Sequence, residues 1–216
     1  MTVRSIEQYR IDLRDRLIEA AIRQFGELGF DGASTRAIAS GANTTMSNIT
    51  YHFGSKRGLF CSAEVAIASR LGQVVTKAIA EVLSSDASNA QRLDQICGVL
   101  RRIGTFMLTD EAKPMALFVS REQQNPQSII RKYMRREFNN VADIFAREIR
   151  QIRTDLSYEG CRMIVFFLFG MAVFLRSSRL SLCVFMDVED INQEMSKALL
   201  ARLDGIARGA ICGEPV

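Results

Sequence analysis

The chain has 216 residues but only three prolines, Pro114, Pro126 and Pro215. Proline interrupts helices more reliably than any other residue, because it lacks a backbone N–H and clashes with the preceding turn. Long helices are therefore permitted over most of the sequence. Hydrophobic residues make up 48% of the chain, which is ample for a buried core, so disorder is not expected. No polar–apolar alternation typical of strands competes with the helical patterns.

Apolar residues from Asp12 onward predict one amphipathic helix that ends at Gly29, a residue suited to a left-handed cap. A short turn then leads to a new start at Ser34-Thr35 and a short second helix over 36–41. A third short helix follows, capped by Thr44 or Thr45. The apolar positions of the first helix are Leu13, Leu17, Ala21, Phe25 and Leu28.

A fourth helix can run without a strong breaker from Ser55 to about Leu83, and a polar break follows over 84–89. Helical patterns then resume over about 90–108, 112–123, 127–152, 157–180 and 188–208. The sequence thus predicts an all-α fold of about nine helices.

Residues 35–53 have the layout of a helix-turn-helix, in which the second helix can enter the DNA major groove. The turn is expected near Ala42-Asn43, because asparagine tolerates a positive φ. Ile38, Ala39, Ala42 and Ile49 are expected to face inward. Left outward are short polar or flexible side chains that can reach base edges, the alternative being an ordinary solvated face. These outward residues are Thr45, Met46, Ser47 and Asn48.

The charge distribution agrees with a phosphate-facing surface. A net charge of +4 proves nothing by itself, but no Asp or Glu occurs from Gly32 to Ala63, although the chain holds 24. Arg36, Lys56 and Arg57 stand unopposed in this window. A surface that approaches phosphates gains by losing its carboxylates, with chance clustering as the alternative.

Other classes of function are disfavoured. His52 is the only histidine and no glycine-rich phosphate-binding loop occurs, so neither an enzyme nor a cofactor or metal is expected. The five cysteines are widely separated and no secretory leader precedes them, which predicts reduced thiols in the cytoplasm. The apolar run from Met163 to Leu175 is shorter than the roughly 20 residues of a membrane span, which favours a core or interface helix.

Several motifs at fixed spacing occupy the first third of the chain: Ala20-Ala21 with Phe25, Gly29 and Phe30, then Thr35-x-x-Ile38-Ala39, then Tyr51-His52-Phe53 with Ser55-Lys56 and Leu59-Phe60. This combination resembles the TetR family of bacterial transcription regulators. The chain departs from the common pattern at Asn43, Thr44 and Thr50, where glycine, a small aliphatic residue and a first tyrosine are usual. These departures concern the turn geometry and one phosphate contact.

The resemblance implies a tetracycline-repressor-like architecture, with a helix-turn-helix DNA-binding domain over 1–60 and an effector-binding and dimerisation domain over 61–216. It implies that Thr35, Tyr51, His52 and Lys56 contact the phosphate backbone of the DNA, and Arg36 is added to this set. Residues 45–48 are expected to contact the bases. For His52 the alternative is packing beside the fourth helix.

The function implied is a sequence-specific regulator, a ligand-responsive repressor that binds a palindromic operator as a homodimer in the cytoplasm, on the nucleoid. No membrane partner is expected. The alternative is an organiser of the same fold that binds DNA without a ligand and acts through protein partners.

Ile49-Thr50-Tyr51 and the stretch from Phe118 to Gln123 before Asn125-Pro126 are similar to regulators with a CecR-like C-terminal domain. The predicted effector pocket comprises Phe106, Met107, Phe118, Arg121, Glu122, Phe138, Phe167 and Met171. Core packing is the alternative for its apolar members, and a salt bridge for Arg121 and Glu122. The predicted dimer interface comprises Phe166, Phe169, Gly170, Val173, Met195, Leu199 and Leu203, with burial inside one monomer as the alternative.

Overall fold

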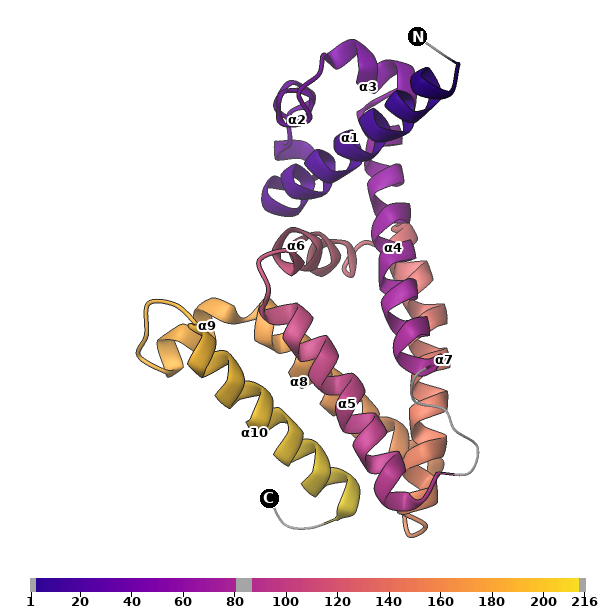
Figure 1. Ribbon diagram of the computed structural model, residues 1–216, viewed down its shortest axis with the longest axis vertical. Coiled ribbons are helices and arrows are strands. Elements are labelled where there is room, and N and C mark those ends of the chain that lie inside the picture. The colour runs from indigo at the N-terminus through magenta and orange to yellow at the C-terminus, as the bar shows by residue number, and fades with distance from the viewer. Residues whose placement is uncertain (1–2, 81–86, 214–216) are drawn as a thin grey trace. The chain divides into compact units, whose positions relative to one another are not determined.

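The computed structural model describes residues 3–80 and 87–213, and in these ranges the regular structure is helical throughout (Figure 1). The predicted all-α class is confirmed. The helices are α1 (Val3–Gly32), α2 (Thr35–Gly41), α3 (Met46–Phe53), α4 (Lys56–Ala80), α5 (Asn89–Leu108), α6 (Ala112–Glu122), α7 (Ile129–Ile152), α8 (Tyr158–Ser177), α9 (Arg179–Phe185) and α10 (Gln193–Cys212). The expected end of the fourth helix near Leu83 and most of the polar break over 84–89 lie outside the described residues.

The chain divides into two compact units. Unit 1 comprises residues 1–71 and 114–134, and unit 2 comprises residues 72–113 and 135–216. The helices α4 and α7 each contribute to both units. Unit 1 therefore contains more than the segment 1–60 predicted to bind DNA, because it also includes the first part of α4 beyond residue 60 and most of α6.

An aromatic cluster joins three helices in the core of unit 1. The ring centroids of Phe25 and Phe60 lie 4.9 Å apart, and those of Phe60 and Phe118 lie 5.0 Å apart. All three side chains are buried. Phe118 thus brings α6 onto α1 and α4, and burying three aromatic side chains supplies a large share of the apolar contact that stabilises this unit.

Two polar contacts fix the ends of helices in unit 1. Arg121 of α6 donates to the carbonyls of Gly26 (3.1 Å) and Glu27 (3.0 Å), near the point where Gly29 interrupts α1 with a φ of 74°. Such carbonyls lack partners within their own helix. The buried carboxylate of Glu64 accepts from Ser128 Oγ (2.5 Å) and from the backbone N–H of Ile129 (3.0 Å), at the start of α7.

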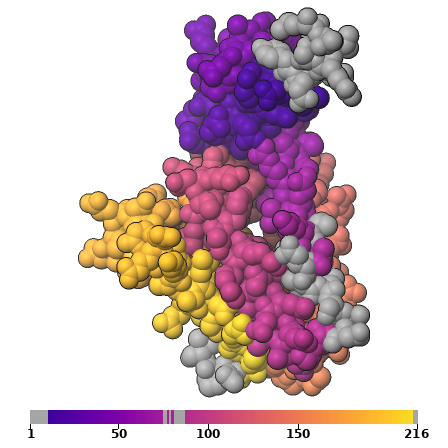
Figure 2. Space-filling model, viewed as in Figure 1, coloured from indigo at the N-terminus to yellow at the C-terminus, as the bar shows by residue number. Residues whose placement is uncertain are grey.

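Unit 2 is built on contacts among α5, α8 and α10, and Figure 2 shows α10, in yellow, lying along α5 at the surface. Its core includes Ile96, Cys97, Phe145, Leu168 and Ala207, all buried. Burial raises the pKa of the Cys97 thiol to about 11, against the opposing influence of the nearby Arg208. That arginine pairs with Asp94 and Asp204 and ties α10 to α5.

The α8–α9 corner breaks a segment that the sequence predicts as a single helix over 157–180. Arg176 is buried and donates to the carbonyls of Met107 and Thr109 at the end of α5. Just beyond it, Arg179 pairs with Asp190 in the loop before α10. These long-range contacts hold the chain in a corner, so the described residues form ten helices and not the nine expected.

One face of α8 is buried and the other is exposed. Cys161, Val165, Leu168 and Ala172 lie in the core. By length and composition α8 alone among the described helices could cross a membrane, with a mean hydropathy of 1.6. A single such helix is weak evidence, because core helices of soluble proteins pass the same test.

Candidate nucleic-acid interface

The α2–turn–α3 segment is held by local hydrogen bonds. Ser34 caps α2 by accepting from the N–H of Ala37, and the N–H of Thr44 donates to the carbonyl of Ala39 (2.9 Å). Asn43 has a φ of 53°, which confirms the predicted left-handed turn residue where the family's usual pattern has glycine. The departure at Asn43 therefore leaves the turn intact.

The four residues expected to face inward do so. Ile38, Ala39, Ala42 and Ile49 are each no more than 2% exposed. Contacts of α1 with α2, and of α2 with α3, complete a small three-helix core. The opposite side of α3 is consequently fixed in its orientation toward solvent.

Thr45, Met46 and Ser47 are exposed on that side, and Asn48 is half-buried. The hydroxyls of Thr45 and Ser47 lie 2.7 Å apart. Asn48 Nδ2 donates to Thr44 Oγ1 (2.7 Å), so the hydroxyl that replaces a small aliphatic side chain at Thr44 holds the asparagine amide. Hydrogen bonds among these side chains therefore hold them in place.

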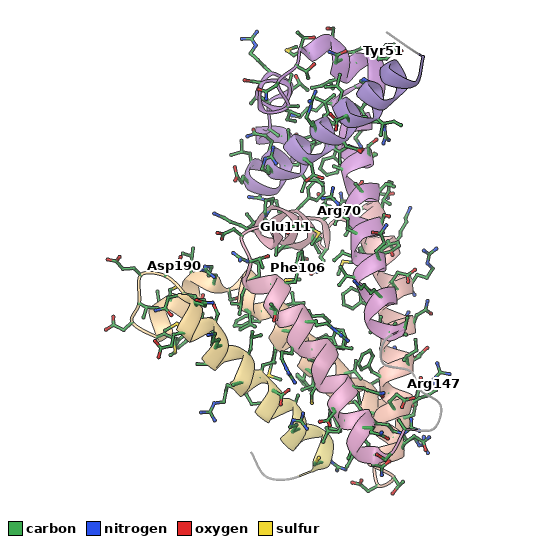
Figure 3. The ribbon with its side chains drawn as sticks, in the orientation of Figure 1. Tyr51, Arg70, Phe106, Glu111, Arg147 and Asp190 are labelled. Atoms are coloured by element: carbon green, nitrogen blue, oxygen red, sulfur yellow. The ribbon has the colours of Figure 1, made fainter. Side chains whose placement is uncertain are left out.

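Three of the five predicted phosphate contacts lie at the end of α3 and the start of α4. Tyr51, labelled in Figure 3, is 66% exposed, and its ring centroid lies 5.0 Å from that of the half-buried His52. On α2, Arg36 is exposed and Thr35 is half-buried.

Lys56 is held in place by the exit of α1. Its Nζ lies 4.8 Å from the ring centroid of Phe30 and 3.4 Å from the carbonyl oxygen of Asp31. The guanidinium of Arg57 lies over the same ring, at 5.6 Å. An ammonium has three donors, so these contacts position Lys56 and leave it capacity for a further acceptor.

Three features of this region were not foreseen in the sequence. Gly54 has a φ of 74°, and a Cβ added to Gly58 would lie 2.0 Å from the carbonyl oxygen of Phe53. Any side chain at Gly58 would therefore force α3 and α4 apart. The guanidinium of Arg14 lies 5.5 Å from the ring centroid of Phe53, which links α1 to the last residue of α3. The only sequence signal was a glycine just inside a helix start.

On its C-terminal side the carboxylate-free window is followed by a buried carboxylate. Glu64 follows the window directly, but it is only 2% exposed and is engaged with Ser128 and Ile129. The formal charges within the window are therefore all positive: Arg36, Lys56 and Arg57. This electrostatic pattern suits an anionic polymer.

The residues predicted to form an effector pocket are divided between the two units. Phe118 lies in the aromatic cluster, Arg121 binds backbone carbonyls, and Glu122 accepts from Asn125 Nδ2 (2.9 Å), all in unit 1. The others lie in unit 2, where Phe138 and Phe167 are exposed, Met107 is buried, and Phe106 and Met171 are half-buried.

The residues predicted to form a dimer interface are of two kinds. Phe166 (73% exposed) and Gly170 lie at the surface of α8, whereas Phe169 packs its ring 5.3 Å from that of Phe145 in the core and Leu203 is buried. Val173, Met195 and Leu199 are half-buried. Met163, Phe167 and Phe174 are further exposed apolar residues of α8.

A family model described as bacterial regulatory proteins of the tetR family matches residues 17–63, the segment that holds α2, α3 and the ends of α1 and α4 that flank them. This segment of the chain is therefore similar to the TetR family. Among residues 3–80 and 87–213, no group of three or more His, Cys, Asp or Glu side chains could hold a metal ion.

Proteins similar to this chain are named as regulators of transcription. It is 32% identical over 125 residues to the transcriptional dual regulator CecR of Shigella flexneri, covering 52% of each chain. It is 30% identical over 82 residues to the transcriptional repressor AcnR of Corynebacterium glutamicum, covering 38% of this chain and 44% of that protein. The match to CecR thus spans about half of that relative's length.

Solved structures resemble this chain in fold over most of its length. The fatty acid degradation regulator FadR from Bacillus halodurans superposes with a TM-score of 0.62 at 15% identity, over 91% of this chain and 95% of that chain. A TetR-like transcriptional regulator from Rhodococcus sp. RHA1 gives a TM-score of 0.61 at 16% identity, over 93% and 96%. At this level of identity the likeness carries the fold alone.

Proposed function

We propose that this protein is a sequence-specific DNA-binding regulator of transcription of the TetR family. The observation that carries the proposal is the outward face of α3, where Thr45, Met46 and Ser47 stand exposed above a buried three-helix core in a window without carboxylates. A rigid helix that presents short polar side chains and no negative charge suits the major groove. Repression is the expected mode, as in the relative named AcnR.

Base reading falls to the first turn of α3. The side-chain amide nitrogen of Asn48 donates a hydrogen bond to Thr44 Oγ1. The side-chain carbonyl oxygen of Asn48 can then accept a hydrogen bond from a DNA base. In the major groove such donors are the amino groups of adenine and cytosine. Thr45 and Ser47 can donate or accept, and Met46 can pack on a thymine methyl.

Phosphate contacts are assigned to Thr35, Arg36, Tyr51, His52 and Lys56. These residues come from α2, from the end of α3 and from the start of α4. They lie on both sides of residues 45–48, which are proposed to contact the bases. Each phosphate neutralised by a cation releases about 0.9 of a counterion, so binding should weaken steeply with salt. The placement of Lys56 against Phe30 reduces the side-chain entropy lost on binding.

A homodimer is the proposed assembly. Met163, Phe166, Gly170 and Phe174 recur at three- and four-residue spacing and form an exposed apolar stripe on α8. A stripe of this kind is unusual on a monomer surface, and a second copy pairing through α8 and α10 would bury it in an isologous interface. A twofold dimer would then read a palindromic operator.

Response to a small-molecule effector is proposed for unit 2, with the cytoplasm as the site of action. The alternative is a ligand-independent organiser of the same fold that acts through protein partners. The two differ in one measurable quantity, the operator affinity with and without candidate ligands. An effector that shifts operator affinity supports the first, because coupling between the two sites must be reciprocal.

Selection of bound duplexes from a random pool by the full-length protein tests the proposal. We expect enrichment of a palindrome whose half-sites are spaced by about one helical turn, 10–10.5 base pairs, or a multiple of it. The selected duplex is then titrated at several salt concentrations. Failure to enrich any motif, together with affinity that is independent of sequence, would contradict specific recognition.

A further inference from the structure

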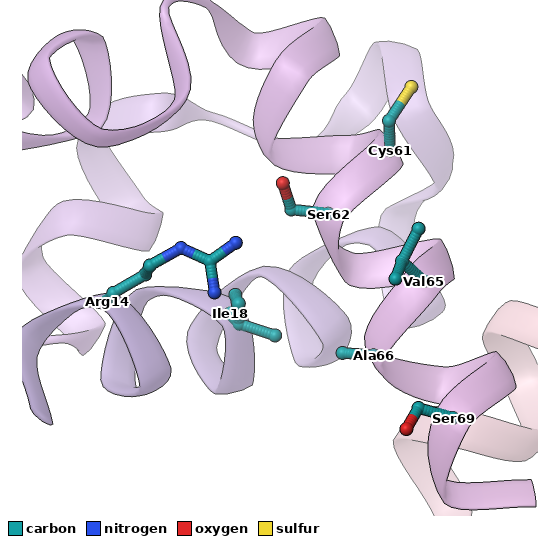
Figure 4. Close-up of a pocket in the computed structure, with 7 residues that line it drawn as sticks. All are labelled: Arg14, Ile18, Cys61, Ser62, Val65, Ala66 and Ser69. Atoms are coloured by element: carbon teal, nitrogen blue, oxygen red, sulfur yellow. The ribbon is translucent and has the colours of Figure 1, made fainter. Parts of the chain in front are cut away.

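A groove of about 440 Å³ lies between α1 and α4 in unit 1 (Figure 4). Arg14 and Ile18, one turn apart, line it from α1, while Cys61, Ser62 and Val65 lie along the facing side of α4. None of these residues belongs to the proposed DNA contacts or to the predicted effector pocket. The groove falls within the 300–1,000 Å³ typical of small-molecule sites.

The groove combines an apolar wall with one uncompensated cation. Ile18 and Val65 supply the wall, and Figure 4 shows the Arg14 guanidinium reaching from α1 toward Ser62. Among the described residues Arg14 forms no ion pair, and its guanidinium lies over the Phe53 ring. The nearby Asp12 is engaged by Arg16 (3.7 Å). The fork of N–H donors on a guanidinium matches the paired oxygens of a carboxylate or a phosphate, and beside an apolar wall a carboxylate with an apolar tail fits both features.

We propose that this groove binds a small organic carboxylate with a short apolar tail. The carboxylate pairs with the Arg14 guanidinium and can accept from the Ser62 hydroxyl, while the tail covers Ile18 and Val65. The site is separate from the effector site proposed for unit 2 and does not depend on it. Because Arg14 also contacts Phe53, the ligand lies one side chain away from α3.

Cys61 provides a direct reporter of occupancy, because it lines the groove and is half-buried. The full-length protein is alkylated with iodoacetamide, with octanoate as the probe, and each cysteine is followed by peptide mass spectrometry. At an octanoate concentration about ten times the dissociation constant, alkylation of Cys61 should slow about tenfold. The exposed Cys212 should react at an unchanged rate and serves as the internal control.

Variants separate the proposed site from other binding. Arg14→Gln should abolish the protection by octanoate, whereas Arg23→Gln, an exposed arginine on the same helix but outside the groove, should retain it. Val65→Glu at an exposed position introduces a repelling charge and should also abolish protection. Each variant is compared with itself, with and without octanoate, so intrinsic changes in cysteine reactivity cancel.

The uncharged alcohol 1-octanol tests the need for the carboxylate and should give no protection. Absence of protection by octanoate would overturn the proposal, as would equal protection by 1-octanol or in Arg14→Gln. Thermal stabilisation by octanoate without protection of Cys61 would place the ligand elsewhere and would also overturn it. None of these outcomes depends on DNA binding.

Discussion

Replacing Glu64 by alanine removes the acceptor that holds the start of α7 against α4. Glu64 Oε1 accepts from both Ser128 Oγ (2.5 Å) and the N–H of Ile129 (3.0 Å), and the side chains of Glu64 and Ser128 are almost completely buried. In Glu64→Ala the hydroxyl and the N–H would remain buried without their partner. The carboxylate also lies at the positive end of α7, where a negative charge is favourable.

The expected cost follows from these two contacts. A hydrogen bond to a charged group contributes about 1.5–3 kcal/mol, so two contribute about 3–6 kcal/mol. Removing a buried carboxylate also relieves its desolvation, which offsets part of this sum. We therefore expect Glu64→Ala to lower the free energy of unfolding by about 3 kcal/mol. Glu64→Gln keeps the shape and the Oε1 acceptor and loses only the charge, so its cost should be about 1 kcal/mol.

Urea denaturation followed by circular dichroism measures both free energies, and amide exchange in the first turn of α7 locates the effect. Glu27→Ala, which removes an exposed carboxylate of α1, is the matched control and should stay within about 0.5 kcal/mol of the wild type. The assigned role of the Oε1 acceptor is wrong if the free energy of unfolding of Glu64→Ala stays within about 0.5 kcal/mol of the wild type. It is also wrong if Glu64→Gln lowers that free energy as much as Glu64→Ala does.

Lys56→Ala should weaken binding to all duplexes alike and lower the slope of log K against log salt by about one, whereas Lys197→Ala on α10 should leave it unchanged in fluorescence anisotropy titrations. Thr44→Val removes the hydroxyl that holds the Asn48 amide and should change the base preferred at one operator position, read by repeated duplex selection. Phe166→Asp, at a 73% exposed position, should shift sedimentation from dimer to monomer without loss of helical circular dichroism. Burial raises the pKa of Cys97 from 9.0 to about 11, so the fold favours the neutral thiol. The neutral thiol contributes fully to stability below pH 9, and this contribution is lost as the pH rises to 11. Between these two pH values, urea denaturation should show that the free energy of unfolding falls by about 2–3 kcal/mol more in the wild type than in Cys97→Ala.

Local rules predicted the helix-turn-helix closely, because its geometry is set by residues near one another in sequence. Gly29 and Asn43 both have the positive φ expected of them. The predicted helix over 90–108 begins one residue earlier, at Asn89, where Ser88 and Gln91 form a capping box. Such signals need no knowledge of the tertiary fold.

The α8–α9 corner could not be predicted, because long-range contacts set it. No proline or glycine stands between Arg176 and Arg179, and the helical pattern runs through. The corner is held where Arg176 reaches carbonyls at the end of α5 and Arg179 pairs with Asp190. The acidic stretch before α10, read as a helix start near 188, supplies that partner, and α10 instead begins after the capping residue Asn192.

The assignment of Phe118 and Arg121 to an effector pocket also depended on long-range contacts that the sequence does not reveal. An apolar face on α6 predicts that the helix packs against something, but periodicity does not identify the partner. In the structure Phe118 lies against Phe60, and Arg121 binds carbonyls at the end of α1. Both residues are occupied in holding unit 1 together, so a ligand that engaged them would have to displace these contacts.

Phe30 illustrates how a motif residue acquires a physical role that its pattern does not contain. In the sequence it marked the exit of the first helix, whereas in the structure its ring lies under both Lys56 Nζ and the Arg57 guanidinium. A cation over an aromatic face is attracted to it without giving up its hydrogen-bond donors. The two cations are thereby placed beside α3 while remaining able to bind phosphate, and an aliphatic side chain at position 30 could fill the same space without providing this attraction.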